Sequence, residues 1–146
     1  MALAVAEAVG AEIISVDSMQ VYRGMDVGTA KPTPAQQARV RHHLIDLADP
    51  AAPFSVAEFQ RAGREALAEL AGRGVPALIV GGSGLHFRAL VDPLVFPPHD
   101  PEVRSEVEAL GPREAVAALL AADPAAGATL DLANPRRVSR ALEVLR

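Results

Sequence analysis

The chain has 146 residues, of which 50% are hydrophobic, and it carries a formal net charge of −4 and no cysteine. A chain of this length can bury one modest core, and its acidic balance argues against a broad electrostatic grip on nucleic acid. The lack of cysteine excludes a disulfide framework and a thiolate metal site. No apolar run approaches the roughly 20 residues of a membrane span and no secretory signal is recognisable, so we expect a cytoplasmic protein without a membrane partner.

The first part of the chain alternates helical and strand patterns. A helix is predicted over residues 1–9, with Gly10 as its C-terminal cap, and the β-branched run of residues 11–16 predicts a buried parallel strand. The patterns that follow predict a short helix, a longer helix and a second buried strand, over residues 34–41, 55–72 and 76–80. Such alternation indicates an α/β fold.

A crowd of prolines after Leu94 marks a boundary, at Pro93, Pro97, Pro98 and Pro101. Beyond it only helical patterns occur. Asp100 as N-cap with Pro101 behind it predicts a helix over residues 100–110, and two further helices are predicted over 111–122 and from Asn134 onward. An all-helical part is therefore expected to follow the α/β part.

The strongest functional signal lies where the first strand ends, at Asp17. Open α/β sheets bind their ligands at the carboxyl ends of strands, although a lone aspartate there more often caps a turn. The segment that follows has far more polar side chains than a plain connection needs, namely Ser18, Gln20, Tyr22, Arg23, Asp26, Thr29 and Lys31. This density favours a functional role for Asp17.

A second candidate is the turn Gly81-Gly82-Ser83-Gly84, between the second buried strand and a helical stretch. Glycines there permit close backbone approach, and a helix N-terminus attracts anions. The Ser83 hydroxyl can donate to phosphate, yet such turns are also common packing chemistry. For His42 and His43 no third ligand has suitable spacing, so we expect packing and hydrogen bonding there rather than metal binding.

The segment Asp17–Pro32, DSMQVYRGMDVGTAKP, resembles the signature of the tRNA dimethylallyltransferase family. The resemblance continues in order through five further stretches: HHLIDLADP (42–50), FSVAEF (54–59), GGSGL (81–85), DPEVR (100–104) and RVSRALEV (137–144). It implies a partial P-loop-type parallel sheet with helices over 1–95, a helical insertion domain over 96–133, and the start of a returning tRNA-contacting helix over 134–146.

The same resemblance implies a monomeric enzyme that acts on the anticodon stem-loop of tRNA with Mg²⁺. The enzyme would transfer a dimethylallyl group from dimethylallyl diphosphate to the exocyclic amine of the adenosine 3′ of the anticodon. Asp17 resembles the general base, and Ser83 with Gly82 and Gly84 resembles the residues that contact the departing diphosphate. The positions that resemble tRNA contacts are Asp17, Ser18, Met19, Gln20, Arg104, Arg136, Arg137, Val138, Ser139 and Arg140.

Three of these arginines also have an ordinary structural interpretation. Arg137 and Arg140 are three residues apart and can form a solvated basic helix face. Arg104 can pair with Glu108 one helical turn further on.

The family's P-loop, GxxxxGK[ST], would precede Met1, and its later C-terminal portion would follow Arg146. We therefore expect an incomplete, inactive piece with no complete metal site. The two strands should then lack a central partner and leave four side chains exposed, those of Ile13, Ile14, Leu78 and Ile79. Two alternatives stay open: a degenerate remnant that at most binds RNA or a partner, and a relative of P-loop small-molecule kinases, which the long signature disfavours.

Overall fold

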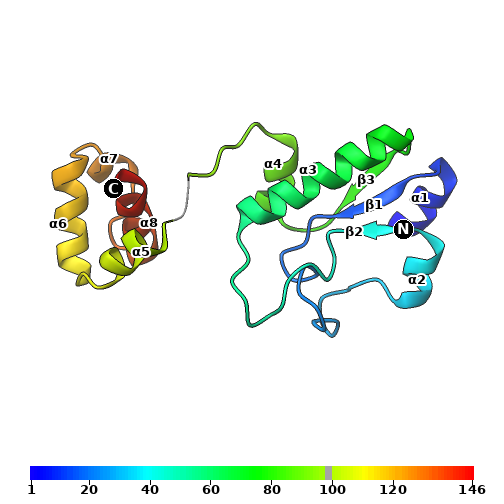
Figure 1. Cartoon of the computed structure of the whole chain (residues 1–146), viewed down its shortest axis with the longest axis horizontal. Coiled ribbons are helices and arrows are strands. Elements are labelled where there is room, and N and C mark those ends of the chain that lie inside the picture. Colours follow the sequence, from blue (N-terminus) through cyan, green and yellow to red (C-terminus); the bar gives the residue numbers. More distant parts are fainter. Residues whose placement is uncertain (98–99) are drawn as a thin grey trace. The chain divides into compact units, whose positions relative to one another are not determined.

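The structure is a computed structural model that describes residues 1–97 and 100–146. It consists of two compact units, Met1–Leu94 and Val95–Arg146, each with its own apolar core (Figure 1). The predicted proline-rich boundary falls at the junction of the units, and its residues Pro98 and His99 lie outside the described part of the chain.

The first unit is an α/β unit built on a three-stranded parallel sheet with the strand order β2-β1-β3. Its elements are, in chain order, α1 (Ala2–Val9), β1 (Glu12–Ser15), α2 (Pro34–Arg39), β2 (His42–His43), α3 (Val56–Arg73), β3 (Ala77–Val80) and α4 (Gly84–Val91). The predicted α/β fold class is thereby confirmed for residues 1–94.

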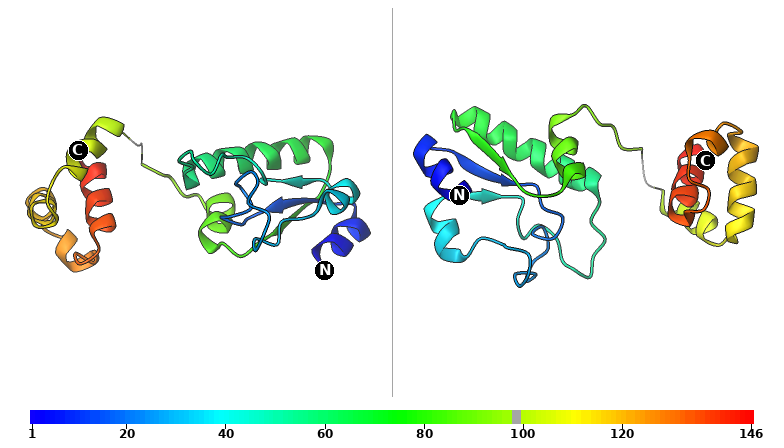
Figure 2. Two further views of the ribbon diagram at one scale, coloured as in Figure 1. Left: turned by 90° about the horizontal axis from the view of Figure 1, so that it is seen from below. Right: turned by 180° about the vertical axis from the view of Figure 1, so that it is seen from behind.

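Helices cover both faces of the sheet. Successive residues of a strand point to opposite sides, so neighbouring residues of β1 pack on different faces. Ile14 packs with Phe59 and Leu70 of α3 on one face. Ile13 packs with Ala6 of α1 and with Val40 on the other. Figure 2 shows α3 and α1 on opposite sides of the strands, so β1 is buried from both directions.

The expectation that the strands lack a central partner is wrong. β1 is itself central, with Ile13 opposite His42 on one side and opposite Leu78 on the other. Ile13 and Ile14 are accordingly only 3% and 0% exposed. The sequence pattern missed β2, because a strand of two histidines has neither the length nor the β-branched composition of a strand signal. Leu78 and Ile79 of β3 are half-buried, so they are neither exposed, as expected for strands without a partner, nor fully buried, as the strand pattern predicts; Ala77 is exposed.

An ionic cluster joins the start of β1 to β2 and α3. Both Glu12 carboxylate oxygens accept hydrogen bonds from the Arg73 guanidinium, at 2.7 and 2.9 Å, and Oε2 lies 2.6 Å from His43 Nε2. The hydrogen bonds from Arg73, helped by His43, lower the pKa of Glu12 to about 2 against the opposing effect of burial. His42 Nδ1 lies 2.8 Å from the Val40 carbonyl, so both histidines hydrogen-bond, as predicted.

The second unit is helical and comprises α5 (Pro101–Glu108), α6 (Pro112–Ala122), the unpredicted short α7 (Ala126–Thr129) and α8 (Pro135–Leu145). Leu119 of α6 and Val138 of α8 are buried in its core. On α8, Val138 and Leu142 are buried, whereas Leu145 is 48% exposed. Within residues 1–97 and 100–146, no helix is long and apolar enough to cross a membrane.

Candidate active site

Asp17 lies directly beyond the carboxyl end of β1, two residues after Ser15. Its Oδ1 accepts hydrogen bonds from the backbone N–H groups of Met19, at 2.8 Å, and Gln20, at 3.2 Å. This is the turn-capping role of the ordinary interpretation. The other oxygen, Oδ2, accepts no hydrogen bond from the described residues, so the carboxylate is held in place and still offers one oxygen to a ligand.

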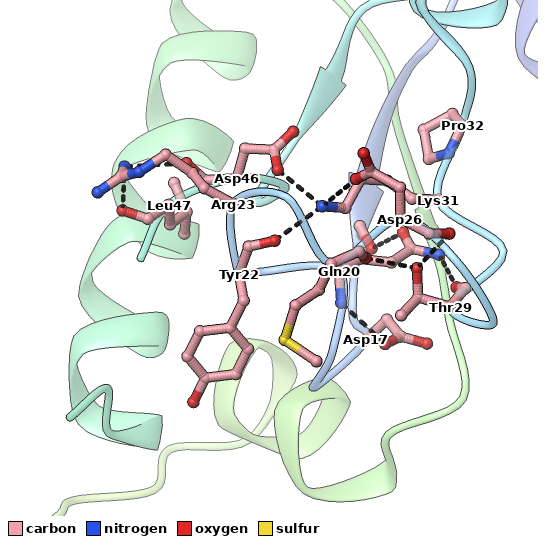
Figure 3. A network of polar contacts seen from close by, with 12 residues as sticks. Asp17, Gln20, Tyr22, Arg23, Asp26, Thr29, Lys31, Pro32, Asp46 and Leu47 are labelled. Atoms are coloured by element: carbon pink, nitrogen blue, oxygen red, sulfur yellow. Dashed lines mark hydrogen bonds and ion pairs between the residues drawn. The ribbon is translucent and has the colours of Figure 1, made fainter. Parts of the chain in front are cut away.

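The polar segment after Asp17 is fastened by Lys31, whose side chain is only 4% exposed (Figure 3). Its ammonium contacts the Tyr22 carbonyl at 2.7 Å, Asp46 at 2.7 Å and Asp26 at 2.9 Å. Burial works against the charge, but the two carboxylates outweigh it and raise the pKa of Lys31. The density of polar residues in this segment thus serves in part to fix its own backbone.

Gln20 braces the same segment from within. Its Oε1 accepts from the Ser15 hydroxyl at 2.9 Å, and its Nε2 donates to the Thr29 carbonyl at 3.0 Å. Both ends of the amide are therefore engaged inside the protein. Ser18 is exposed and Met19 is 42% exposed, so these two side chains, rather than Gln20, are presented to the outside.

The glycine turn after β3 lies against the end of β1. Val16 donates its N–H to the Val80 carbonyl at 2.7 Å, and its own carbonyl accepts from Ser83 N–H at 3.0 Å. A Cβ on Gly81 would lie 2.4 Å from the Val16 carbonyl oxygen, so only glycine fits there. Since Asp17 follows Val16, the turn and the carboxylate meet at the same edge of the sheet.

His86 also belongs to this edge, and the sequence analysis missed it. Its Nδ1 lies 2.6 Å from Ser83 Oγ, and its ring packs edge-on against Phe59 with centroids 4.4 Å apart. Burial lowers the pKa of His86, while the nearby charge of Asp17 acts in the opposite direction. A serine at a helix start with a histidine three residues later is the sequence signal that could have revealed the contact.

The basic residues of the second unit differ in their availability. Arg104 pairs with Glu108 at 2.7 Å, as in the ordinary interpretation. Arg140 donates to Glu143 at 2.8 Å and to the Pro97 carbonyl at 3.2 Å. Arg136 and Arg137 are exposed on α8.

Two other positions on α8 that the resemblance assigns to tRNA contact are buried or half-buried. Val138 is 1% exposed in the core, so the assignment of its side chain to tRNA contact is corrected to core packing. Ser139 is half-buried. The helical periodicity that places Val138 opposite the arginines accounts for this outcome.

No metal centre is formed by the described part of the chain. Nowhere in residues 1–97 and 100–146 do three or more His, Cys, Asp or Glu side chains come together in a way that could hold a metal ion. The residues present therefore do not fit a self-sufficient Mg²⁺ site.

The parallel sheet carries a carboxylate and a glycine turn at its carboxyl edge, which is where open α/β proteins bind their ligands. The model of the IPP transferase family matches residues 20–146, and the chain belongs to this family. It is 51% identical over 139 residues to the tRNA dimethylallyltransferase of Bifidobacterium longum, and 48% identical over 151 aligned positions to that of Halorhodospira halophila.

Solved structures agree with this assignment. The tRNA isopentenylpyrophosphate transferase of Bacillus halodurans matches 98% of the chain at 42% identity with a TM-score of 0.60. A eukaryotic dimethylallyltransferase acting on tRNA, 23% identical, matches 98% of the chain with a TM-score of 0.83 and supports the fold. The chain spans 42% of the Bifidobacterium protein, 49% of the Halorhodospira protein and 49% of the Bacillus structure.

Proposed function

We propose that this chain forms part of the active site of a tRNA-modifying prenyltransferase. The reaction would move a dimethylallyl group from dimethylallyl diphosphate to the exocyclic amine of the adenosine 3′ of the anticodon. Support comes from the family membership and from one geometric observation. The backbone of Val16 joins the Asp17 carboxylate to the Ser83 turn, which brings a proton acceptor and an anion-binding turn to one edge of the sheet.

Asp17 is the proposed general base. An exocyclic adenine amine is a weak nucleophile, because its lone pair is delocalised into the ring, so removal of its proton assists formation of the new bond. As the C–N bond forms, the C–O bond to diphosphate breaks and Asp17 Oδ2 takes up the amine proton. The bonds from Met19 and Gln20 to Oδ1 fix the carboxylate while it does so.

Ser83 and the amides of its turn are proposed to stabilise the leaving diphosphate. Charge develops on the diphosphate as the C–O bond breaks, and oriented donors at a helix N-terminus stabilise such charge. Ser83 precedes α4, and Gly82 and Gly84 leave open space around its backbone. A diphosphate at this turn would lie beside the carboxylate that receives the proton.

The proposed macromolecular partner is the anticodon stem-loop of tRNA. The target adenine has to leave its stack to reach a side chain in a pocket. Ser18 and Met19 are the side chains proposed to contact it, and Arg136 and Arg137 of the second unit are proposed to pair with phosphates; all four are exposed. The family resemblance also implies Mg²⁺, but the described residues supply no ligand set, so we assign it no residue.

The test is Asp17→Asn in a chimera that frames residues 1–146 with the flanking segments of the Bifidobacterium longum relative. Asparagine keeps the Oδ1 acceptor and the turn but cannot take up a proton. We expect prenyl transfer to fall by about 10²–10⁴-fold with tRNA affinity unchanged.

The matched control is Asp49→Asn, because Asp49 Oδ1 caps a turn in the same manner by accepting from Ala51 N–H at 2.8 Å. This control should leave prenyl transfer unchanged. Transfer by Asp17→Asn at the rate of the control would remove Asp17 from the role of general base.

A further inference from the structure

Ser83 occupies the N-cap position of α4, yet its side chain does not cap the helix. A serine at this position normally accepts a hydrogen bond from the backbone N–H two or three residues further on. Its hydroxyl instead lies 2.6 Å from His86 Nδ1. The N–H groups of Leu85 and His86 consequently have no hydrogen-bond partner within residues 1–97 and 100–146.

The His86 ring is itself held by packing. It meets the ring of Phe59, which is 0% exposed, at an interplanar angle of 84°. Serine alone has little control over its χ1 angle, because its side chain is unbranched. The contact with an immobile ring therefore selects one direction for the Ser83 hydroxyl.

The hydrogen bond between Ser83 and His86 leaves the Ser83 hydroxyl able to donate its proton to an anion. Burial keeps the pKa of His86 below its usual value, so the ring is neutral at pH 7. A neutral imidazole carries its single proton on either nitrogen. With the proton on Nδ1, the ring donates to Ser83 Oγ and the hydroxyl proton is available to a phosphate oxygen.

We propose that His86 is a positioning residue, which keeps the Ser83 hydroxyl off the first turn of α4 and directs it toward the diphosphate. By the same contact it leaves the Leu85 and His86 amides open to the anion. The inference rests on the proposed diphosphate role of Ser83 and adds the residue that controls it. It applies whichever prenyl acceptor the protein uses.

Two substitutions separate hydrogen bonding from packing. His86→Asn keeps a nitrogen at the place of Nδ1, because Asn Nδ2 and His Nδ1 are each bonded to Cγ. It loses the ring. His86→Phe retains a ring against Phe59 but loses the bond. His42→Phe is the control, since His42 also makes one hydrogen bond through Nδ1, to Val40, but lies away from the turn.

The measurements are the affinity of the 146-residue chain for inorganic pyrophosphate by calorimetry and the χ1 populations at Ser83 by NMR couplings. We expect His86→Phe to weaken pyrophosphate binding about 5- to 10-fold, as loss of one hydrogen bond in the anion site would do, and to average χ1. His86→Asn should retain most of the affinity and a single rotamer, and His42→Phe should change neither.

The outcomes distinguish the two proposals. If Ser83→Ala weakens binding but His86→Phe does not, the role of His86 is overturned and that of Ser83 stands. A loss with His86→Asn and none with His86→Phe assigns the histidine to packing and overturns its positioning role. If the unmutated chain does not bind pyrophosphate, or Ser83→Ala changes nothing, the proposed diphosphate role fails, and the inference with it.

Discussion

Replacing Glu12 by glutamine should destabilise the first unit in a way that depends on pH. The carboxylate accepts two hydrogen bonds from Arg73 and contacts His43, and its side chain is 16% exposed. Glutamine has nearly the same size but no charge, so the partners lose their counter-ion. The cluster joins β1 to β2 and α3, and its loss should therefore be visible in global unfolding.

The magnitude follows from the pKa of Glu12, which is lowered from 4.5 to about 2. Since one pKa unit corresponds to about 1.4 kcal/mol, the shift sets a ceiling of about 3 kcal/mol. The Arg73 side chain is 39% exposed, and solvent screening of such a partner reduces the expected loss to about 1–2 kcal/mol.

The sign of the pH dependence follows from the lowered pKa. The contribution is complete above pH 4.5, the ordinary pKa, and is lost as pH falls toward about 2. Urea unfolding of the chain and of Glu12→Gln at several pH values between 7 and 2 should show the difference between them shrinking over this window.

Glu7→Gln is the matched control, because Glu7 also pairs with an arginine through two bonds, to Arg39, but at the surface. It should cause little loss at any pH. A Glu12→Gln difference that stays constant from pH 7 to pH 2 would refute the electrostatic reasoning.

Three further expectations concern the site and α8. Ser83→Ala in the chimera should raise the barrier to prenyl transfer by about 3–4 kcal/mol with little change in tRNA affinity, and an unchanged single-turnover rate would contradict it. Lys31→Met should lower the free energy of unfolding, measured with urea, by about 1–3 kcal/mol, because the Tyr22 carbonyl loses its donor. Equal stability would show that the segment keeps its conformation without Lys31. Arg137→Ala with Arg140→Ala should reduce the log–log salt slope of tRNA binding by about 0.7–0.9 per lost phosphate contact, whereas an unchanged slope would make both ordinary surface residues.

The sequence was most informative where local pattern and tertiary environment agree. The β-branched run before Asp17 marks β1, and the strand-end rule singles out Asp17 as a candidate ligand contact. That the Ser83 turn lies at the same edge is seen only in the structure. β2 escaped detection because its two histidines become a strand only through pairing with β1, a contact between distant parts of the chain.

Side-chain choices at the site were less predictable. Ser83 has the sequence of a helix cap, and the spacing of three residues to His86 permits a contact but does not show that the hydroxyl prefers it to the helix amides. Val138 shows the opposite case, because helical periodicity alone places it on the buried face of α8. The family resemblance had assigned it to tRNA, and burial decides between the two.

In the proposed role of Asp17 as general base, its two oxygens would have separate functions during turnover. Backbone amides donate to Oδ1, so the proton taken from the amine would reside on Oδ2. Oδ2 could then gain and lose a proton while the hydrogen bonds to Oδ1 stay in place. The backbone of the segment through Lys31 would keep the same conformation from one cycle to the next. The turn would use Oδ1 and the proton transfer would use Oδ2, so loss of one proton would be enough to return Asp17 to its starting state.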